Sequence, residues 1–270
     1  METKELAKQI RIKVLQMVHK ANASHIGGAY SMADILAVLY NEIINIDVLD
    51  YKNPERDRFF LSKGHSCAGL YAVLGLKNFF PIDELDTYAQ DGSKFISHVS
   101  HHIPGVEASS GSLGHILPIA CGVAYSAKIN QQKFKIYCLL SDGELNEGSN
   151  WEPIMLAPQH KLSNLVLIID YNKIQSLGAV KDIIDLEPLR AKFEAFRWNV
   201  HEVDGHDTPK LSELFKSINS NISEIPNVVI AHTIKGKGVD FMENKLLWHY
   251  RSPDKELFDA AYNQLTNSSL

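Results

Sequence analysis

Three carboxylates stand close together directly after an apolar run that is typical of a buried strand. The stretch "YCLLSDGELNEGSNWEP" covers residues 137 to 153 and places Asp142, Glu144 and Glu147 after that run, with no Lys or Arg beside them. Such a loop repels anions unless a hard cation lies between, and Mg²⁺ is commonly shared between protein oxygens and phosphate oxygens. Gly143 has no side chain, so a phosphate could come close to the backbone N–H groups there. The loop therefore indicates a cation site for a phosphate-bearing ligand.

A second oxygen donor follows the next apolar run along the chain. Asn172 comes directly after "NLVLIID" (164 to 170) and one more residue, about one strand–helix–strand unit beyond Asp142. If both runs are parallel strands, the two side chains lie at the edge of the sheet where open α/β sheets bind ligands. An ordinary turn is the alternative, because "SDG" is a common turn sequence and Asn172 suits an Asx turn. Spacing alone does not decide between a diphosphate–metal site and a turn.

The elements that must position these residues alternate between strand and helix. Strands are predicted at 58–62, 134–140, 164–170, 198–203 and 227–233, and helices between them at 66–79, 112–131, 149–162, 187–196 and 208–221. This alternation predicts an α/β fold, a doubly wound, mostly parallel sheet flanked by helices. Two further helices are expected to flank "ANASHIGGAY", the second beginning at Ser31 as N-cap with Asp34 at the capping-box position. Residues 1–270 are predicted to form a single domain, with 250–270 as a closing helix and tail.

Composition favours a globular protein whose partners are small molecules or other proteins. The 270 residues are 45% hydrophobic and 22% charged, with a net charge of −5. No basic patch indicates nucleic acid, and no apolar run is long enough to predict contact with a membrane. Cys67, Cys121 and Cys138 lie far apart without metal-type spacing, which favours reduced thiols and a cytoplasmic location.

The acidic loop is also part of a wider pattern. "SDGELNEGSNWE" followed by "DYNKIQ" resembles the GDG…N motif of thiamine-diphosphate enzymes, and the rest of the chain resembles the N-terminal half of transketolase. The matching segments keep the family order across nearly the whole chain: "ASHIGG", "DRFFLSKGHS", "SHVSHHIPGVEASSGSLGH", "VDGHD", "TIKGKG" and "MENKLLWH". The resemblance implies the diphosphate-binding domain of this fold, with thiamine diphosphate and Mg²⁺ (or Ca²⁺ or Mn²⁺) as cofactors.

The resemblance further implies roles for particular residues. The metal ligands would be Asp142, Asn172 and the backbone carbonyl of Ile174. The cofactor-binding residues would be His65, Leu113, Gly143, Glu144, Lys235 and His249, and the catalytic residues His25, His98 and His249. Glu147 and Glu152 match carboxylates at the family's subunit contact.

The other histidines are expected to have structural or surface positions. His206 is expected to cap a turn and a helix, for which Asp207 and Thr208 are N-cap candidates. His115 is left undecided. Ordinary surface or core positions are expected for His101, His102, His160 and His201.

The implied function is that of the N-terminal subunit of a two-chain transketolase, which transfers a two-carbon ketol unit from a ketose donor to an aldose acceptor. In this family a Glu on a pyrimidine-binding domain activates thiamine diphosphate, and no such domain is expected in this chain. The expected partner is a C-terminal subunit that carries this domain and its Glu, in a heterotetramer of two plus two chains. A sugar or sugar phosphate is the expected substrate.

Two alternatives are an α subunit of a 2-oxo-acid dehydrogenase-type decarboxylase and a non-catalytic relative. The histidines in "GH" (64–65), "SHV" (97–99) and "WH" (248–249) favour transketolase, because a ketose has several hydroxyls to bind and a 2-oxo acid does not. The metal-ligand candidates argue against a non-catalytic relative. Two departures from the family pattern, "GHIL" at 114–117 where a second glycine is common and Tyr250 after the histidine, leave room for a specialised or nucleotide-linked sugar, whereas Ser141 for the first Gly of the motif is expected to leave binding intact.

Overall fold

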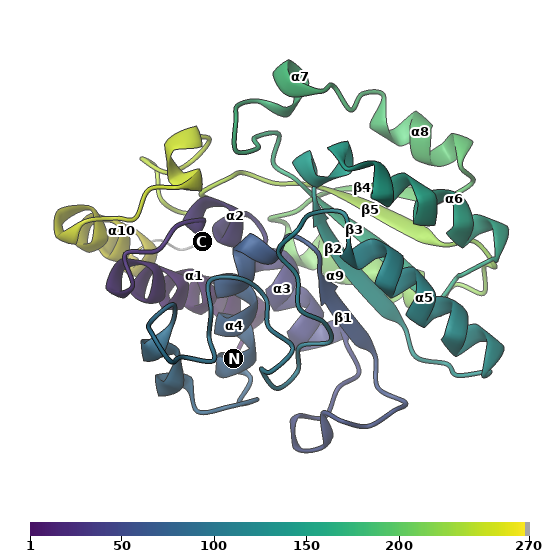
Figure 1. Cartoon of the computed structure of the whole chain (residues 1–270), viewed down its shortest axis with the longest axis horizontal. Helices are drawn as coiled ribbons and strands as arrows, with labels where there is room; N and C mark the ends of the chain where they lie inside the picture. The colour runs from purple at the N-terminus through teal and green to yellow at the C-terminus, as the bar shows by residue number, and fades with distance from the viewer. Residues whose placement is uncertain (268–270) are drawn as a thin grey trace.

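Five parallel strands form one sheet in the order β1-β2-β3-β5-β4 (Figure 1). The structure is a computed structural model, and it describes residues 1–267 of the chain. All five predicted strands are found, and their bounds are β1 (Arg58–Leu61), β2 (Ile136–Ser141), β3 (Leu165–Tyr171), β4 (Asn199–Asp204) and β5 (Asn227–His232). The predicted fold class is therefore confirmed.

Helices connect the strands and cover both faces of the sheet (Figure 1). In the described part of the chain they are α1 (Thr3–Lys20), α2 (Ile26–Ser31), α3 (Ala33–Val38), α4 (Cys67–Leu76), α5 (Ile116–Ile129), α6 (Trp151–Gln159), α7 (Val180–Ile183), α8 (Leu189–Ala195), α9 (Thr208–Ser220) and α10 (Lys255–Asn267). One π-helical turn, Leu39–Ile43, continues α3. Short 3₁₀ turns include Gly64–Ser66, Gly143–Asn146 and Leu246–His249, which lie near the candidate site.

Residues of the central strands alternate between two hydrophobic cores, one on each face of the sheet. Tyr137 and Leu139 of β2 pack in the core that contains α1, α3, α4 and α9, whereas Cys138 and Leu140 pack in the core that contains α5, α6 and α8. Because both faces are covered, a strand at the centre of the sheet must be apolar at every position. This explains why β2 and β3 are continuous apolar runs in the sequence.

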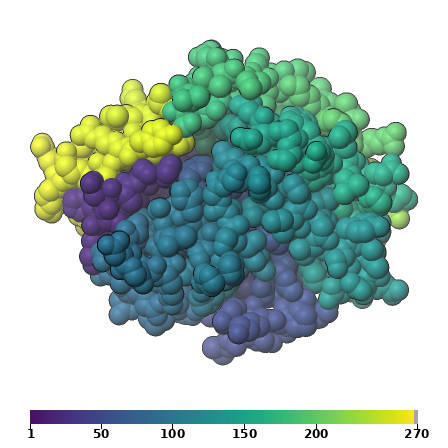
Figure 2. Space-filling view, viewed as in Figure 1, coloured from purple at the N-terminus to yellow at the C-terminus, as the bar shows by residue number. Residues whose placement is uncertain are grey.

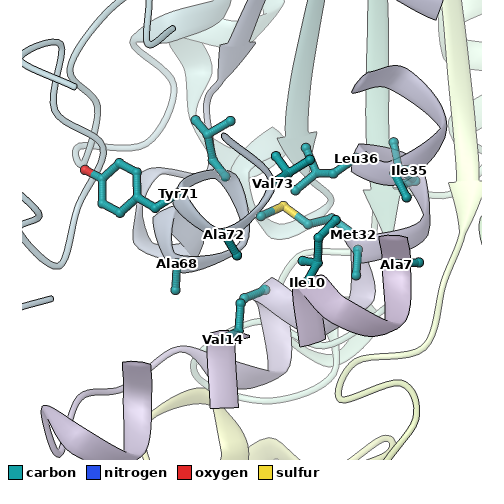
Figure 3. Packing of buried hydrophobic residues seen from close by; sticks show 14 of the residues in the cluster. Ala7, Ile10, Val14, Met32, Ile35, Leu36, Ala68, Tyr71, Ala72 and Val73 are labelled. Atoms are coloured by element: carbon teal, nitrogen blue, oxygen red, sulfur yellow. The ribbon is translucent and has the colours of Figure 1, made fainter. Parts of the chain in front are cut away.

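Three helices pack closely on one face of the sheet and form the base on which α2 rests. Ile10 and Val14 of α1 contact residues of α3 and α4, with Met32 between the helices (Figure 3). A Cβ atom on Gly69 of α4 would lie 2.7 Å from the Cε atom of Met32, so this glycine leaves room for the methionine side chain. The tight packing holds α2 and the residue before it, His25, in a fixed place.

Segment 26–31 differs from the prediction, because "IGGAYS" forms the helix α2 and is not a link between two helices. All six residues are buried, and a Cβ atom on Gly28 would lie 2.8 Å from the Oγ atom of Ser66. Close packing therefore explains this glycine, and burial outweighs its low helix propensity. Ser31 is the last residue of α2 and not an N-cap, since its hydroxyl donates to Asp170 at 2.6 Å.

The two ends of the described chain lie next to each other. Helix α10 packs against α1, and Figure 2 shows the yellow C-terminal segment beside the purple N-terminal one. The predicted closing helix is found as α10, and the last part of the predicted tail, residues 268–270, lies outside the described residues. No helix within residues 1–267 is long and apolar enough to cross a membrane.

Candidate active site

A cavity of about 200 Å³ opens at the carboxyl ends of the strands. Loops after β1, β2, β3 and β5 line it, which is where parallel sheets usually bind ligands. His98 is not in the lining, but its ring centroid lies 6.1 Å from that of His25. The cavity brings together nearly all the predicted site residues: His25, His65, Leu113, Asp142, Gly143, Glu144, Asn172, Ile174, Lys235 and His249.

The three predicted metal ligands all line this cavity. Asp142 is buried, and its carboxylate accepts hydrogen bonds from the N–H groups of Gly143 at 2.7 Å and Lys173 at 2.5 Å. The Oδ1 atom of Asn172 accepts from the N–H of Ile174 at 3.2 Å, and the Ile174 carbonyl accepts from the Nζ atom of Lys235 at 2.9 Å. These backbone contacts fix the loops that carry all three oxygens.

The donor set fits a hard divalent cation. One carboxylate, one amide and one carbonyl are the oxygen ligands that suit Mg²⁺, with further positions left for phosphate and water. Burial, and secondly the nearby Asp170 carboxylate, raise the pKa of Asp142 to about 6, so a cation beside it would stabilise the charged form. Within residues 1–267 no three His, Cys, Asp or Glu side chains group as a metal site.

Asp170 is the centre of a buried hydrogen-bond network that the sequence did not reveal. Its Oδ2 atom accepts from Ser31, from the ammonium group of Lys63, and from the Nδ2 atom of Asn172 at 3.3 Å, while its Oδ1 atom accepts from the Thr233 hydroxyl. Burial by itself would raise the pKa of Asp170, but the Lys63 charge and the donated hydrogen bonds lower it. The ionised carboxylate holds the amide nitrogen of Asn172, which leaves the amide oxygen for the cavity.

Two lysines from distant segments supply the positive charge that the acidic loop lacks. Lys63 and Lys235 both line the cavity and are only 1% and 3% exposed. Burial, followed by repulsion from Lys63, lowers the pKa of Lys235 to about 8. Sequence reasoning missed Lys63, and the available signal was a lysine inside an otherwise apolar or small run, two residues before His65.

Three histidines form a compact group at the mouth of the cavity. The ring centroid of His25 lies 5.2 Å from those of both His65 and His249, and the last two are 5.6 Å apart. Burial is the main cause that lowers the pKa of His25 to about 4 and of His249 to about 3, and nearby positive groups lower both further. The pKa of His65 is lowered for the same reason. All three imidazoles are therefore neutral near pH 7 and act as hydrogen-bonding groups.

The backbone and side-chain contacts of His25 and His249 define their orientation. His25 has φ of 71°, an uncommon left-handed conformation for a non-glycine residue, and its N–H donates to the His249 carbonyl at 2.8 Å. The Nδ1 atom of His249 lies 2.8 Å from the Nζ atom of Lys235. Because the ammonium group must donate, Nδ1 accepts, and the proton of neutral His249 is on Nε2.

Glu144 lines the cavity, but its carboxylate is engaged with the protein itself. It accepts hydrogen bonds from the Ser62 hydroxyl at 2.5 Å, the Gly114 N–H at 2.9 Å and the Ser141 N–H at 3.3 Å. Burial raises the pKa of Glu144 despite these donors. The side chain thus connects the acidic loop to the loop that carries Leu113.

The remaining predicted positions lie outside the cavity. Glu147, Glu152 and His115 are exposed on the surface near the acidic loop and the start of α5 and α6. His206 does not cap the helix, since the N-cap of α9 is Asp207, which accepts from the N–H of Lys210 at 3.1 Å. The prediction for His206 was wrong in this respect, because its imidazole bonds to residues far away in the sequence.

A parallel α/β sheet with a carboxylate, an amide and two lysines at its carboxyl edge is suited to a protein that binds a phosphate-bearing cofactor with a divalent cation. The chain matches the family model "Transketolase, thiamine diphosphate binding domain" over residues 2–256. It is 43% identical to one of the subunits of the apulose-4-phosphate transketolase of Actinobacillus succinogenes, over 98% of this chain and 96% of that one. The chain therefore belongs to the transketolase family.

Further relatives agree with this assignment. The 6-deoxy-6-sulfo-D-fructose transketolase subunit SqwG of a Clostridium species is 37% identical over 96% of this chain and 94% of that one. The crystal structure of transketolase from Campylobacter jejuni superposes with a TM-score of 0.89 at 33% identity, and the match covers 98% of this chain but 42% of that protein. The chain thus spans nearly all of the subunit relatives and less than half of the long transketolases. These matches confirm thiamine diphosphate as the cofactor and support transketolase over the 2-oxo-acid dehydrogenase alternative.

Proposed function

We propose that this chain binds the diphosphate end of thiamine diphosphate together with Mg²⁺ and, with a second subunit, transfers a two-carbon ketol unit from a ketose to an aldose. The observation that carries the proposal is the single cavity shared by the oxygen donors Asp142, Asn172 and Ile174, the cations Lys63 and Lys235, and three neutral histidines. Oxygen donors suit the metal, the lysines suit phosphate, and the histidines suit sugar hydroxyls.

Each group of residues has a separate task in this mechanism. Thiamine diphosphate supplies the nucleophile and the electron sink for cleavage of a C–C bond beside a carbonyl. Lys235 would offset the negative charge of the phosphates, while Asp142, Asn172 and the carbonyl of Ile174 would hold the metal. In this structure the N–H of Gly143 donates to the Oδ1 atom of Asp142 at 2.7 Å. This hydrogen bond would have to break before the N–H could donate to a phosphate oxygen.

His25 and His249 hold or move protons at the sugar. The Nδ1 atom of His25 is engaged by the Ser24 hydroxyl at 2.9 Å, and that of His249 by Lys235 at 2.8 Å, so Nε2 is the free nitrogen of both rings. Nε2 of His249 carries a proton and donates to a substrate oxygen. His98, one ring further out, would contact a more distant hydroxyl of the donor.

The partner subunit is proposed to cover the mouth of the cavity. A groove lined by Ser176, Leu246, Leu247, Tyr250 and Arg251 adjoins the cavity and shares Ser176 and Tyr250 with it. Leu247 and Tyr250 are 57% and 62% exposed, and nearby Leu177 is 73% exposed, which is unusual for apolar residues beside a catalytic site. We propose a pyrimidine-binding domain with its catalytic Glu as the occupant, in a heterotetramer with Glu147 and Glu152 at a subunit contact.

The substrate class follows from the same site and from the relatives. Two relatives are named for ketoses with an anionic end, a phosphate in apulose 4-phosphate and a sulfonate in 6-deoxy-6-sulfo-D-fructose. We propose a sugar or sugar phosphate for this chain as well, with residues for the anionic end on the partner. Tyr250 stands at the cavity mouth, 4.6 Å from the His249 ring, where it limits the shape of the donor.

Three free, buried cysteines support a location in the cytoplasm.

Calorimetric titration with thiamine diphosphate tests the proposal. The chain should bind it in the presence of Mg²⁺, and chelation of Mg²⁺ or the substitution Asp142→Ala should abolish binding. Once the complementary subunit is present, ketol transfer should appear, whereas the chain by itself should show none. The proposal would be rejected if thiamine diphosphate bound equally well without Mg²⁺ and in Asp142→Ala. It would also be rejected if the complex of both subunits bound the cofactor but transferred no ketol unit to any sugar.

A further inference from the structure

A chain of buried polar side chains leads from the first helix to the loop that carries Lys235. Arg11 of α1 is 1% exposed and pairs with Asp34 of α3 through two contacts, Nη2–Oδ2 at 2.5 Å and Nη1–Oδ1 at 3.3 Å. Arg11 also donates to the carbonyl oxygen of Tyr30 in α2 at 3.2 Å. The guanidinium group therefore holds the Asp34 carboxylate in one orientation and joins α3 to the last turn of α2.

His206 continues this chain from Asp34 to the backbone beside Lys235. Its Nδ1 atom lies 2.7 Å from the Oδ2 atom of Asp34, and its Nε2 atom accepts the backbone N–H of Ile234 at 2.8 Å. A backbone N–H can only donate, so Nε2 has a free lone pair and the proton is on Nδ1, where it donates to Asp34. The two contacts together select one neutral tautomer of His206.

Ile234 directly precedes Lys235, whose Nζ atom faces the cavity. Other contacts also hold this loop, namely the Thr233 hydroxyl on Asp170, and the N–H of Gly236 on the Gly27 carbonyl at 3.0 Å. His206 accepts the N–H of the peptide bond between Thr233 and Ile234. It therefore fixes the orientation of the backbone directly before Lys235. A change in this peptide would displace a long side chain whose ammonium group must meet a phosphate within hydrogen-bond distance.

Stability alone does not account for this arrangement. Buried ion pairs are weak stabilisers, because the cost of removing both charges from water offsets most of their attraction. An apolar set of the same volume would pack as well in this core, but it could not accept the N–H of Ile234 or define a tautomer. The benefit of these polar groups is therefore a defined geometry at the loop.

We propose that His206 is a positioning residue for Lys235, with Asp34 and Arg11 fixing the tautomer that accepts the Ile234 N–H. The inference rests on the proposed function, in which Lys235 contacts the diphosphate. His206 itself does not line the cavity and takes no part in bond breaking. Its substitution should therefore change cofactor affinity through the Lys235 loop, separately from any effect on the stability of the fold.

Two substitutions separate the two hydrogen bonds of His206. In His206→Asn the amide nitrogen can replace Nδ1 and donate to Asp34, but no acceptor reaches Ile234. In His206→Gln the amide oxygen can replace Nε2 and accept from Ile234, while the bond to Asp34 is lost. His201→Asn is the control, because His201 also bonds to a residue of β5, Asn227 at 3.0 Å, at the far end of the strand.

Calorimetric titration of thiamine diphosphate with Mg²⁺, in the full chain and in its complex with the partner subunit, gives the main result. We expect His206→Asn to bind about tenfold more weakly, and His206→Gln to bind within about threefold of wild type, since a lost hydrogen bond at a charged site has an effect of this size. Hydrogen exchange of the Ile234 amide should accelerate in the Asn variant only. The melting temperature should fall in both His206 variants. His201→Asn should bind thiamine diphosphate with wild-type affinity.

The outcomes distinguish this inference from the proposed function. If the wild-type chain binds no thiamine diphosphate, either alone or in complex with the partner subunit, the proposed function is rejected and the inference with it. Wild-type binding together with unchanged affinity in His206→Asn would reject the inference alone. The Asn and Gln variants could also lose equal affinity, in proportion to their losses of stability. This result would assign His206 a purely structural role and reject the inference.

Discussion

The Nζ atom of Lys235 lies 2.9 Å from the carbonyl oxygen of Ile174, which is the oxygen expected to bind the metal. In this structure the ammonium group of Lys235 therefore binds that carbonyl oxygen, and it also donates to the Nδ1 atom of the neutral His249 imidazole at 2.8 Å. Asp142 and Asp170 favour the charged form of Lys235, although burial and Lys63 lower its pKa to about 8. An ammonium group so placed would be available to phosphate oxygens, and it would have to release the Ile174 carbonyl before that oxygen could bind a metal.

Lys235→Met should weaken the binding of thiamine diphosphate by a factor of about 10 to 100, because a charge-assisted hydrogen bond to phosphate is lost while the apolar stem is kept. Fluorescence or calorimetric titration with saturating Mg²⁺ measures the affinity. Lys237→Met is the matched control, since Lys237 is in the same loop and pairs with Glu243 at 3.6 Å outside the cavity. Equal affinity of Lys235→Met and wild type would contradict this role.

Gly114→Ala should destabilise the fold by more than about 2 kcal/mol, because Gly114 has φ of 81° and an added Cβ would lie 2.5 Å from Ser149 Oγ and 2.7 Å from Glu147 Cβ. Gly122→Ala is the opposite case. Gly122 is exposed in helix α5 with nothing within 4 Å of an added Cβ, so alanine should raise the free energy of unfolding by about 0.5 to 1 kcal/mol. Urea denaturation measures both, and a free energy of unfolding for Gly114→Ala equal to or above that of wild type would show that the loop is not rigid at Gly114.

Leu247→Asp should weaken assembly with the partner subunit by at least about tenfold, because the substitution places a charge in the apolar groove beside the cavity. Sedimentation of the co-purified chains measures assembly, and thermal unfolding of the single chain checks that it remains folded. Ile222→Asp is the control, since Ile222 is 98% exposed in the turn between α9 and β5. If both variants assemble as wild type does, the groove is not the contact surface.

Acid should weaken the fold partly through Asp34. Burial by itself would raise the pKa of Asp34, but Arg11 and His206 outweigh burial and lower it to about 2. The unfolded value is about 4, so ionised Asp34 stabilises the fold above about pH 4, and this stabilisation is lost as the pH falls toward 2.

Urea denaturation at successive pH values below 5 compares wild type with Asp34→Asn, as far as both remain folded. The free energy of unfolding should fall more steeply for wild type, with a total difference of about 2 kcal/mol when Asp34 is fully protonated. Parallel pH curves would mean that Asp34 has an ordinary pKa.

The strands could be predicted from the sequence because burial on both faces leaves a local record, an uninterrupted apolar run such as that of β2. Helix α2 was missed for the opposite reason. Gly27 and Gly28 suggest a loop, whereas in the folded chain they mark close packing, because an added Cβ would lie 3.1 Å from the Lys235 side chain at Gly27 and 2.8 Å from Ser66 Oγ at Gly28. Contacts of this kind depend on residues far away in the sequence, and no local pattern reports them.

The candidate site divides in the same way. Asp142 and Asn172 could be located because each follows a predictable strand at the ligand-binding edge. Asp170 could not, since it looks like one more residue of a buried strand, and its ionised state depends on Lys63 from another loop. Ser31 and Asp34 fit a local capping pattern, but both bond to distant residues. Ser31 donates to Asp170, which is 139 residues away. Asp34 accepts from Arg11 and His206, which are 23 and 172 residues away.

Glu144 joins two loops that would hold opposite ends of an elongated ligand. One carboxylate accepts the N–H groups of Gly114 and Ser141 and the hydroxyl of Ser62, so the loop that carries Leu113 and the acidic loop keep a constant separation. To move the two loops apart or together, a ligand of another length would have to break a hydrogen bond to a buried carboxylate, which costs about 1 to 3 kcal/mol. The proposed site is therefore expected to favour a cofactor of one length.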